Sequence, residues 1–344
     1  MRVIHHTTAG GAEVLELGER PTPEPGPAQV RVRVHAAGLN RADVLQRRGR
    51  YPAPAGWPAD IPGLEYSGTV DQAGGEVSRW KAGDRVMGLV GGGAHAEFVV
   101  VHEDEALPVP DSIDMVEAGA IPESFLTGWD ALVTRGRLVA GERVLLHAVG
   151  SGLGTAMVQI AKRLTATVVG TSRTPAKLEQ ARALGLDIGI DSSGGGFREA
   201  VHEPVNLVID VLGGPAFADN LAILAPRGRL VMLGFLQGSQ VDTSLDPILR
   251  KRLEIIGSVM RTRLLPERIA LVREFEAEVL PLMTEEPAPS GARGRKSLPR
   301  AERGDGTTER LRPIIGATYP FEQIAEAHRA MESNEPFGKI VLTW

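Results

Sequence analysis

The sequence predicts an α/β protein that combines a doubly wound parallel sheet with a separate β-rich domain. Between residues 143 and 259, short apolar runs alternate with stretches of helical periodicity, as expected for parallel strands joined by helices. In the first third, apolar and polar residues alternate with a period of two, and Pro and Gly clusters separate these runs. A chain of 344 residues is long enough for two complete cores.

A glycine-rich turn joins the first apolar strand of the doubly wound region to a helix that begins near Leu153. The turn contains Gly150, Gly152 and Gly154, and the positions that would close a strict G-x-G-x-x-G pattern hold Thr155 and Met157. The start of such a helix attracts phosphate oxygens through unpaired N–H groups and its dipole. The apolar face of the helix recurs at helical spacing, at Leu153, Met157, Ile160 and Leu164.

Such a turn alone is weak evidence, but further strand and helix units follow it in register. We expect strands at 166–172, 187–190, 205–211, 229–235 and 253–259, and a helix at 175–184. Doubly wound sheets bind nucleotides at their strand ends. The turn is therefore interpreted as the site of a dinucleotide pyrophosphate, and a structural turn without a ligand is the alternative.

The first domain shows the pattern of half-buried strands. Val30, Val32 and Val34 alternate with polar residues, and further strands are expected at 85–90 and 96–101. Helices at 266–282 and 321–331 and a strand at 339–344 are too small to form a domain of their own. We expect them to fold back onto the first domain, which gives one domain of residues 1–122 and 263–344 and a second of residues 123–262.

The segment from Glu285 to Arg310 is rich in Pro, Gly, Ser, Arg and Glu and has almost no apolar residues. Such a composition cannot bury enough surface to order itself. We expect a solvated surface loop, and a basic docking arm is the alternative.

Composition excludes several classes of function. The chain has no cysteine, which rules out disulfides, thiolate metal sites and a thiol nucleophile. The net charge of −5 without a basic face gives no support for a nucleic-acid partner. No apolar run approaches the length of a membrane span, and the start lacks the apolar core of a signal peptide, so we expect no membrane partner and a cytoplasmic location.

Several separate motifs resemble one family. They are the stretches 39–43, 45–51, 61–65, 83–86, 120–123 and 338–342. Together they resemble the zinc-free quinone oxidoreductases, the ζ-crystallin-like group of the medium-chain dehydrogenase/reductase superfamily, and most closely its p53-inducible branch. Many members carry A-x-x-G-x-x-G in the phosphate loop, whereas Ser151 of this chain matches that branch. The resemblance implies a GroES-like catalytic domain, a Rossmann domain, and a homodimer formed through the last Rossmann strand.

Zinc-dependent members of the superfamily bind their catalytic metal through Cys or His ligands. By resemblance, the three ligand positions hold Asn40, Leu64 and a residue near Glu123. An amide, an aliphatic side chain and one carboxylate do not make a zinc site, and the eight histidines are scattered. We therefore expect no bound metal.

The end of the second doubly wound strand indicates the cofactor. NAD sites place an acid there for the ribose 2′-hydroxyl, whereas this chain has no acid before Glu179. Ser172, Arg173 and Lys177 are suited to a 2′-phosphate, which predicts NADPH, although the two cations are alternatively ordinary solvated residues. NADPH-binding relatives often have a tyrosine where this chain has Ser192, which removes one contact.

The resemblance also assigns site residues. Asn40, Asp43 and Tyr51 would line the acceptor cleft between the domains, with Tyr51 stacking on a flat acceptor or serving simply as packing. The cofactor would contact Thr127, Ser151, Gly152, Leu153, Gly154, Ser172, Arg173, Lys177, Ser192, Leu233, Gly234, Phe235, Val259, Met260, Arg261 and Lys339.

The expected function is zinc-independent, NADPH-dependent reduction of a small-molecule quinone or related electrophilic acceptor. No general acid stands out, so solvent is expected to supply the proton. Reduction of α,β-unsaturated carbonyls is a second possibility. An NADPH-binding protein with little turnover is a third.

Overall fold

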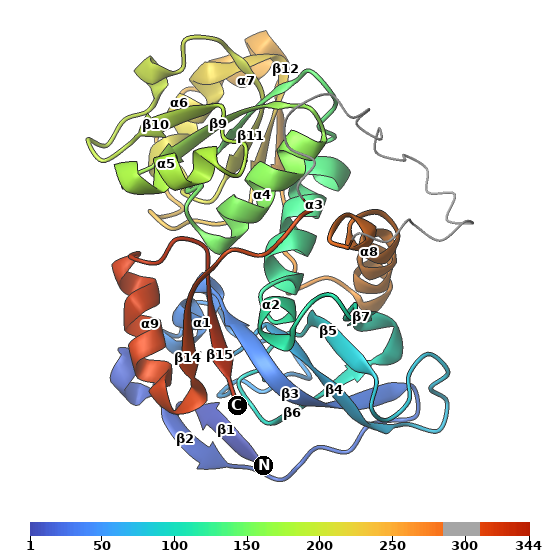
Figure 1. The fold of residues 1–344 in the computed structure, drawn as a ribbon. Coiled ribbons are helices and arrows are strands. Elements are labelled where there is room, and N and C mark those ends of the chain that lie inside the picture. Colours follow the sequence, from blue (N-terminus) through green and yellow to red (C-terminus); the bar gives the residue numbers. More distant parts are fainter. Residues whose placement is uncertain (285–309) are drawn as a thin grey trace. The chain divides into compact units, whose positions relative to one another are not determined.

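The computed structural model describes residues 1–284 and 310–344, which form two compact units (Figure 1). Unit 1 comprises residues 1–126, 260–284 and 312–344, and unit 2 comprises residues 127–259. The domain limits expected at residues 123 and 262 stay predictions. The expected polar loop lies outside the described residues, apart from Arg310.

Unit 2 is built on a six-stranded parallel sheet. Its order is β10-β9-β8-β11-β12-β13, so the chain first moves outward from β8 to β10 and then continues on the other side of β8 with β11. This reversal creates a switch point between the carboxyl ends of β8 and β11, where such sheets bind ligands. The strands are β8 (Arg143–Leu146), β9 (Thr167–Ser172), β10 (Ile188–Asp191), β11 (Val205–Asp210), β12 (Leu224–Met232) and β13 (Glu254–Gly257).

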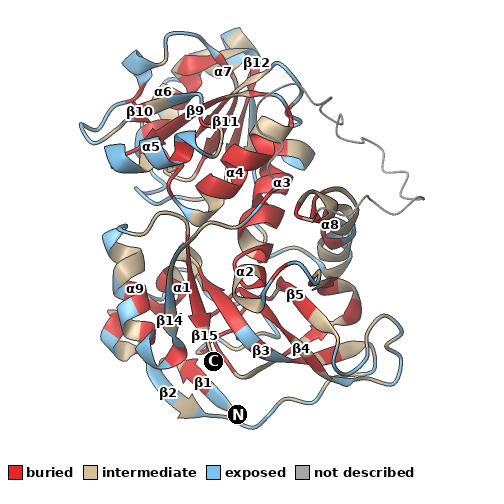
Figure 2. Cartoon of the chain, in the orientation of Figure 1, coloured by how far each residue is buried: buried red, intermediate tan, exposed pale blue. Residues whose placement is uncertain are grey.

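Helices cover the sheet of unit 2. Helix α4 packs on β8 and β9 and buries Met157, Ile160 and Leu164, as its spacing predicted. Each such side chain contributes about 1.5–3 kcal/mol when fully buried. In Figure 2 the strands are largely buried, whereas α5 exposes its outer residues. The helical elements are α3 (Thr127–Trp129), η4 (Asp130–Arg135), α4 (Gly152–Arg163), α5 (Pro175–Arg182), η5 (Arg198–Ala200), α6 (Gly214–Ile223) and α7 (Asp246–Lys251).

Unit 1 contains a seven-stranded, mostly antiparallel sheet. Its order is β14-β15-β3-β4-β5-β7, with β6 also paired to β3, and β1 and β2 form a separate hairpin. Val30, Val32 and Val34 of β3 are buried while Arg33 is exposed, which confirms the period-two prediction. The strands are β1 (Arg2–His5), β2 (Glu16–Glu19), β3 (Gln29–Leu39), β4 (Glu65–Ala73), β5 (Arg85–Leu89), β6 (Phe98–His102), β7 (Ala106–Pro108), β14 (Ile315–Pro320) and β15 (Lys339–Thr343).

The helices of unit 1 are mostly short. The helix expected at 266–282 ends at Glu278, because Pro281 at the start of the next turn cannot continue the α-helical hydrogen bonding. None of the helices in residues 1–284 and 310–344 is long and apolar enough to cross a bilayer. The elements are η1 (Ala12–Val14), α1 (Arg41–Arg47), η2 (Glu103–Glu105), α2 (Met115–Ala118), η3 (Pro122–Leu126), α8 (Leu265–Glu278), η6 (Leu280–Leu282), η7 (Phe321–Gln323) and α9 (Ile324–Ser333).

The two sheets confirm the predicted fold class. The parallel sheet of unit 2 is doubly wound, and the C-terminal strand β15 pairs with β3 in unit 1, as the returning C-terminal segment predicted. Strand limits differ from the expected ones by a few residues, since β10 begins at Ile188 and β12 ends at Met232. These strand ends position the candidate site residues.

Candidate functional site

Asn40 and Asp43 lie at the start of α1 in unit 1, where Asn40 is the residue before the helix. The Asp43 carboxylate accepts hydrogen bonds from the backbone N–H of Asn40 at 2.7 Å and of Gly63 at 2.9 Å. Asp43 is fully buried, and burial raises the pKa of its carboxyl group to about 6 against the opposing effect of these two N–H donors. Asp43 thus fixes the loop that ends at Gly63 against α1.

Glu65 and Lys339 form a buried ion pair beside Asn40. Lys339 begins β15 and Glu65 begins β4, and the strand order β15-β3-β4 brings them together across 274 positions of sequence. Asn40 bridges the pair: its Nδ2 donates to Glu65 Oε1 at 2.9 Å, and its Oδ1 accepts from Lys339 Nζ at 2.7 Å. The Lys339 ammonium, predicted to contact the cofactor, is therefore bonded to two partners within unit 1.

Glu123 completes this cluster from η3. Its backbone N–H donates to Glu65 Oε2 at 2.8 Å. Burial raises the pKa of the Glu123 carboxyl group to about 7, and the nearby Glu65 carboxylate adds to the effect. We call Asn40, Asp43, Glu65, Glu123 and Lys339 the polar cluster of unit 1.

The polar cluster includes two of the three positions that correspond to zinc ligands in the zinc-dependent relatives. The Asn40 amide is engaged by Glu65 and Lys339, and Leu64 is a buried aliphatic residue. In the part of the chain that the structure describes, no group of three or more His, Cys, Asp or Glu residues is placed to hold a metal ion. The absence of zinc stays a prediction.

Tyr51 is half-buried and is held by Arg261. The guanidinium of Arg261 donates to the Tyr51 carbonyl oxygen at 2.9 Å, to the Gly91 carbonyl oxygen at 2.7 Å and to Gln46 Oε1 at 2.5 Å. Its Cζ also lies 4.8 Å from the centroid of the Tyr51 ring, within cation–π range. Arg261, predicted to lie near the nicotinamide through its backbone, thus places its buried side chain in unit 1, where it orders the loop that carries Tyr51.

In unit 2, Ser151, Gly152, Leu153 and Gly154 form the turn from β8 into α4. Ser151 caps the helix, because its Oγ accepts a hydrogen bond from the Gly154 N–H at 3.0 Å. A side chain at Gly154 would place its β-carbon 2.4 Å from the Ala148 carbonyl oxygen, so only glycine fits. The turn lies at the switch point of the sheet, where the sequence predicted the pyrophosphate.

The residues predicted to bind the 2′-phosphate lie at the end of β9. The buried Ser172 hydroxyl exchanges hydrogen bonds with the backbone of Thr174, donating at 3.2 Å and accepting at 3.1 Å, while Arg173 is exposed. Lys177 lies over the phosphate turn, since a β-carbon built on Gly150 would lie 2.5 Å from Lys177 Cδ. Ser192 follows β10, and its N–H donates to the Ser172 carbonyl oxygen at 2.9 Å.

The remaining predicted cofactor residues are divided between the two units. Thr127 begins unit 2, and its buried hydroxyl has no hydrogen-bond partner within residues 1–284 and 310–344. Leu233 and Gly234 are partly buried after β12, whereas the Phe235 side chain is 55% exposed. Val259 ends unit 2 and Met260 resumes unit 1.

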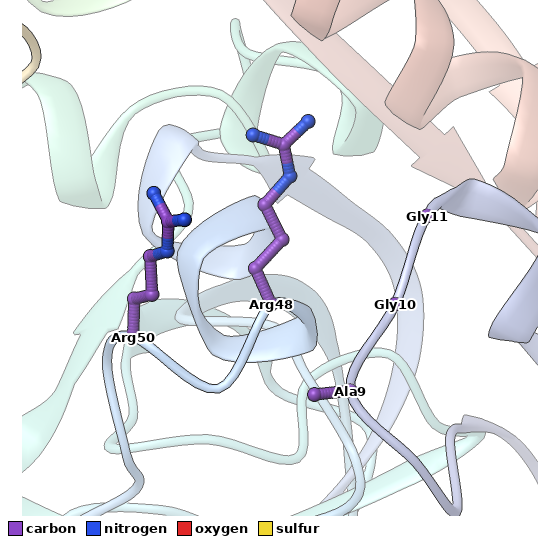
Figure 3. Close-up of a pocket in the computed structure, with 5 residues that line it drawn as sticks. All are labelled: Ala9, Gly10, Gly11, Arg48 and Arg50. Carbon is purple, nitrogen blue, oxygen red and sulfur yellow. The ribbon is translucent and has the colours of Figure 1, made fainter.

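A cavity of about 340 Å³ in unit 1 is lined by Ala9, Gly10, Gly11, Arg48 and Arg50 (Figure 3). The two arginine side chains extend toward the same side of the view. Backbone donors that would complete an anion site are already occupied: Gly10 N–H bonds to the Arg47 carbonyl oxygen, and Gly11 N–H bonds to Glu13. Arg48 pairs with Glu332. We therefore assign no ligand to this cavity.

Sequence reasoning missed Glu65 and Gln46, and it considered Glu123 only as a former metal position. Glu65 is part of the motif at 61–65, but nothing local indicates that its partner is Lys339. Gln46 carries no signal of its own in the sequence. A buried carboxylate at the first residue of a central strand needs a cation, which is the one general signal available for Glu65.

Two family models match the chain. A zinc-binding dehydrogenase model matches residues 152–283, and an alcohol dehydrogenase GroES-like domain model matches residues 26–111. The first falls mainly on unit 2 and the second on the N-terminal part of unit 1. Both models therefore match the units on which the candidate residues lie.

Whole-chain relatives agree with these models. A quinone oxidoreductase from Pseudomonas aeruginosa is 33% identical over 345 residues, covering 98% of this chain and 98% of that protein. The crystal structure of a quinone oxidoreductase from Pseudomonas syringae has a TM-score of 0.79 at 27% identity, covering 100% of this chain and 99% of that one. The crystal structure of an NAD-dependent alcohol dehydrogenase has a TM-score of 0.79 at 30% identity, with 100% of both chains covered.

Proposed function

Because this chain belongs to the quinone oxidoreductase-like group of the medium-chain dehydrogenase/reductase superfamily, we propose that it is a zinc-independent, NADPH-dependent quinone reductase. The observation that carries the proposal is the polar cluster of unit 1. The expected metal positions hold Asn40 and Glu123 of this cluster together with the aliphatic Leu64, and the cluster lies in the same unit as Tyr51 and Arg261, which supports Tyr51.

The cofactor part of the proposal rests on the end of β9. Ser172 and Arg173 take the place where an NAD site has a carboxylate, and Lys177 lies over the phosphate turn beside Gly150. A cation at this position attracts the 2′-phosphate of NADPH, whereas the carboxylate of an NAD site would repel it. When bound, NADPH supplies the hydride, and the protein's own residues orient the acceptor.

The acceptor part of the proposal rests on Tyr51. Arg261 donates a hydrogen bond to the Tyr51 carbonyl oxygen, and its guanidinium lies against the half-buried Tyr51 ring. A ring held in this way offers a flat apolar face at little cost in side-chain entropy. A quinone matches such a face and accepts electrons without a Lewis acid. The partner is therefore a small planar electrophile rather than a macromolecule.

An acceptor screen that follows NADPH oxidation by purified protein tests the proposal. We expect turnover with ortho-quinones, slower turnover with α,β-unsaturated ketones, and a lower kcat/KM with NADH than with NADPH. Enone rates above quinone rates would make the protein an enone reductase. Tight NADPH binding without turnover of any acceptor would leave only a binding protein.

Zinc content is a separate prediction. We expect elemental analysis of protein purified without chelator to give far less than one zinc per chain, and activity to survive EDTA, because Asn40, Leu64 and Glu123 do not provide the ligands of a catalytic site. One zinc per chain, lost together with activity, would contradict this.

A further inference from the structure

We propose that Glu123 is the proton donor of the acceptor site, giving its carboxyl proton to the acceptor once hydride has been transferred. This inference rests on the proposed function and deepens it, since the sequence offered no general acid and left the proton to solvent.

Three carboxyl groups belong to the cluster, and two of them are well supplied with donors. Glu65 accepts hydrogen bonds from Asn40 Nδ2, from the Lys339 ammonium and from the backbone N–H of Glu123. Asp43 accepts two backbone N–H bonds, one on each oxygen. Donors that converge on a carboxyl group favour its ionised form, and both Glu65 and Asp43 have such donors.

Glu123 differs in that no side-chain or backbone donor among residues 1–284 and 310–344 bonds to its carboxyl group. Glu123 is therefore the carboxyl group of the cluster whose protonated form is least opposed by hydrogen-bond donors. The pKa values agree in order, raised to about 7 for Glu123 and to about 6 for Asp43. The charged and titratable groups that face Glu123 are Glu65 of β4, Lys339 of β15, Asp43 of α1, Arg261 and Tyr51.

The position of Glu123 suits proton delivery as well. Its side chain is only partly buried, which leaves a route for a proton from solvent. Its backbone N–H bonds to Glu65, which also accepts from Asn40, so Glu123 lies beside a residue proposed to line the acceptor site. Burial and, next, the charge of Glu123 raise the pKa of the Tyr51 phenol. Thr127, whose buried hydroxyl has no partner among the described residues and is proposed to meet the nicotinamide, follows Glu123 by four positions.

The chemistry balances with NADPH as the two-electron reductant of the proposed function and Glu123 as the proton source. The acceptor gains a C–H or O–H bond from the transferred hydride, and the displaced electron pair moves to its carbonyl oxygen. The O–H bond of Glu123 then breaks, and its proton forms a new bond to that oxygen or, in an enone, to the α-carbon. The Glu123 carboxylate takes a proton from solvent before the next turnover. Hydroquinone anions are weaker bases than enolates, so the need for the acid is greater for an enone.

The test compares Glu123→Gln with wild type over a pH series from about 5.5 to about 9, using an ortho-naphthoquinone and methyl vinyl ketone as acceptors. A positioned general acid contributes about 10²–10⁴-fold. We expect wild-type kcat/KM to fall above about pH 7 as Glu123 loses its proton. The Gln variant should lose about 10²-fold at low pH, more with the enone than with the quinone, and show no such pH dependence.

Controls separate proton donation from a structural role. Glu123→Asp should keep the pH dependence with a partial rate, and Glu117→Gln, a partly buried Glu outside the cluster, should behave as wild type. The dissociation constant for NADPH should change less than about threefold in all three variants, because none of them touches the phosphate turn.

Wild-type rates and pH profile in Glu123→Gln would overturn the proposal. If that variant does not fold, as judged by loss of the NADPH-induced rise in Tm, the wild-type profile decides: a kcat/KM that stays flat from about pH 6 to about pH 9, with no solvent deuterium isotope effect, overturns it. If the wild-type protein reduces no acceptor in the screen, the proposed function itself is refuted. This result differs from a failure of the Glu123 proposal, because it is obtained with the wild-type protein alone.

Discussion

The proposed preference for NADPH depends on individual side chains of unit 2. Lys177 lies over the turn at Gly150, while Ser172 is engaged by the backbone of Thr174. We therefore propose that Lys177 contributes more to recognition of the 2′-phosphate than Ser172, whose hydroxyl is engaged within its own turn. The sequence assigned Lys177 and Ser172 the same role, and their different contacts favour different roles.

Replacing Lys177 by Ala should weaken NADPH binding by about 1–3 kcal/mol, the range of a charge-assisted contact, and leave NADH binding nearly unchanged. Titration of both cofactors by fluorescence or calorimetry measures this. Arg182→Ala on the same helix is the control, because Arg182 is exposed and pairs with Glu179. Equal losses for the two cofactors would show that Lys177 does not meet the 2′-phosphate.

His95 gives a second prediction at this scale. The ring is fully buried, and burial lowers its pKa to about 3 against the opposing effects of a backbone hydrogen bond to Gly38 and of the Glu65 charge. Because the folded pKa lies below the ordinary value of 6.5, the unfolded state takes up the proton first. The contribution of His95 to the free energy of unfolding is therefore fully present above about pH 6.5. It is lost as the pH falls toward about 3, at about 1.4 kcal/mol per pH unit.

His95→Gln should flatten this loss, measured as the slope of unfolding free energy against pH between about 4 and about 6.5. The slope is the readout, since the substitution also changes the stability itself. The exposed His202 supplies a matched control, His202→Gln, which should keep the wild-type slope. Identical slopes in all three proteins would assign the acid sensitivity to other groups.

At the scale of elements, the pair Lys339 and Glu65 joins β15 to β4 across β3. Both side chains are almost fully buried, so removing one partner leaves an uncompensated charge. Lys339→Met should lower the unfolding free energy by about 3–5 kcal/mol. Lys339→Met combined with Glu65→Gln should recover most of that loss, which chemical denaturation of both variants measures. No recovery in the double variant would mean that the charge of Glu65 is not the cause.

The elements themselves were largely predictable, and their pairing was less so. Periodicity located β3, the strand and helix around Gly150, and the return of the C-terminal strand. The sequence also indicated Asn40, Asp43 and Tyr51 as site residues. It did not predict the Lys339–Glu65 ion pair or the contacts of Arg261 with the Tyr51 loop. Those contacts depend on how distant segments pack together, and local sequence patterns do not specify that packing.

For the whole molecule, β13 is an edge strand of the unit 2 sheet. Apolar side chains beside it are exposed, including Leu245, Leu249, Ile255 and Val259. Exposed apolar patches and open sheet edges mark association surfaces. We propose that two copies pair through β13, in accord with the homodimer that the family resemblance implied.

Light scattering should therefore give twice the chain mass at micromolar concentration. Leu249→Glu should shift this toward the monomer, since Leu249 is 80% exposed and its change costs the isolated chain little. Leu17→Glu is the control: Leu17 is 45% exposed and lies on β2 of unit 1, far from β13 in the sequence. A monomeric wild type would remove this proposal.

Strand β15 lies between β14 and β3 in the sheet of unit 1. Its residues Lys339–Thr343 are synthesised some 300 positions after their partners in β3. During translation β3 therefore emerges early, and the part of it that pairs with β15 has no partner until the end of synthesis. All of unit 2 is synthesised in the meantime and is free to fold. A ribosome stalled shortly before residue 339 would therefore carry a folded unit 2 and a unit 1 whose sheet still lacks β15. Pulse proteolysis of such stalled chains should find unit 2 protected and unit 1 digested.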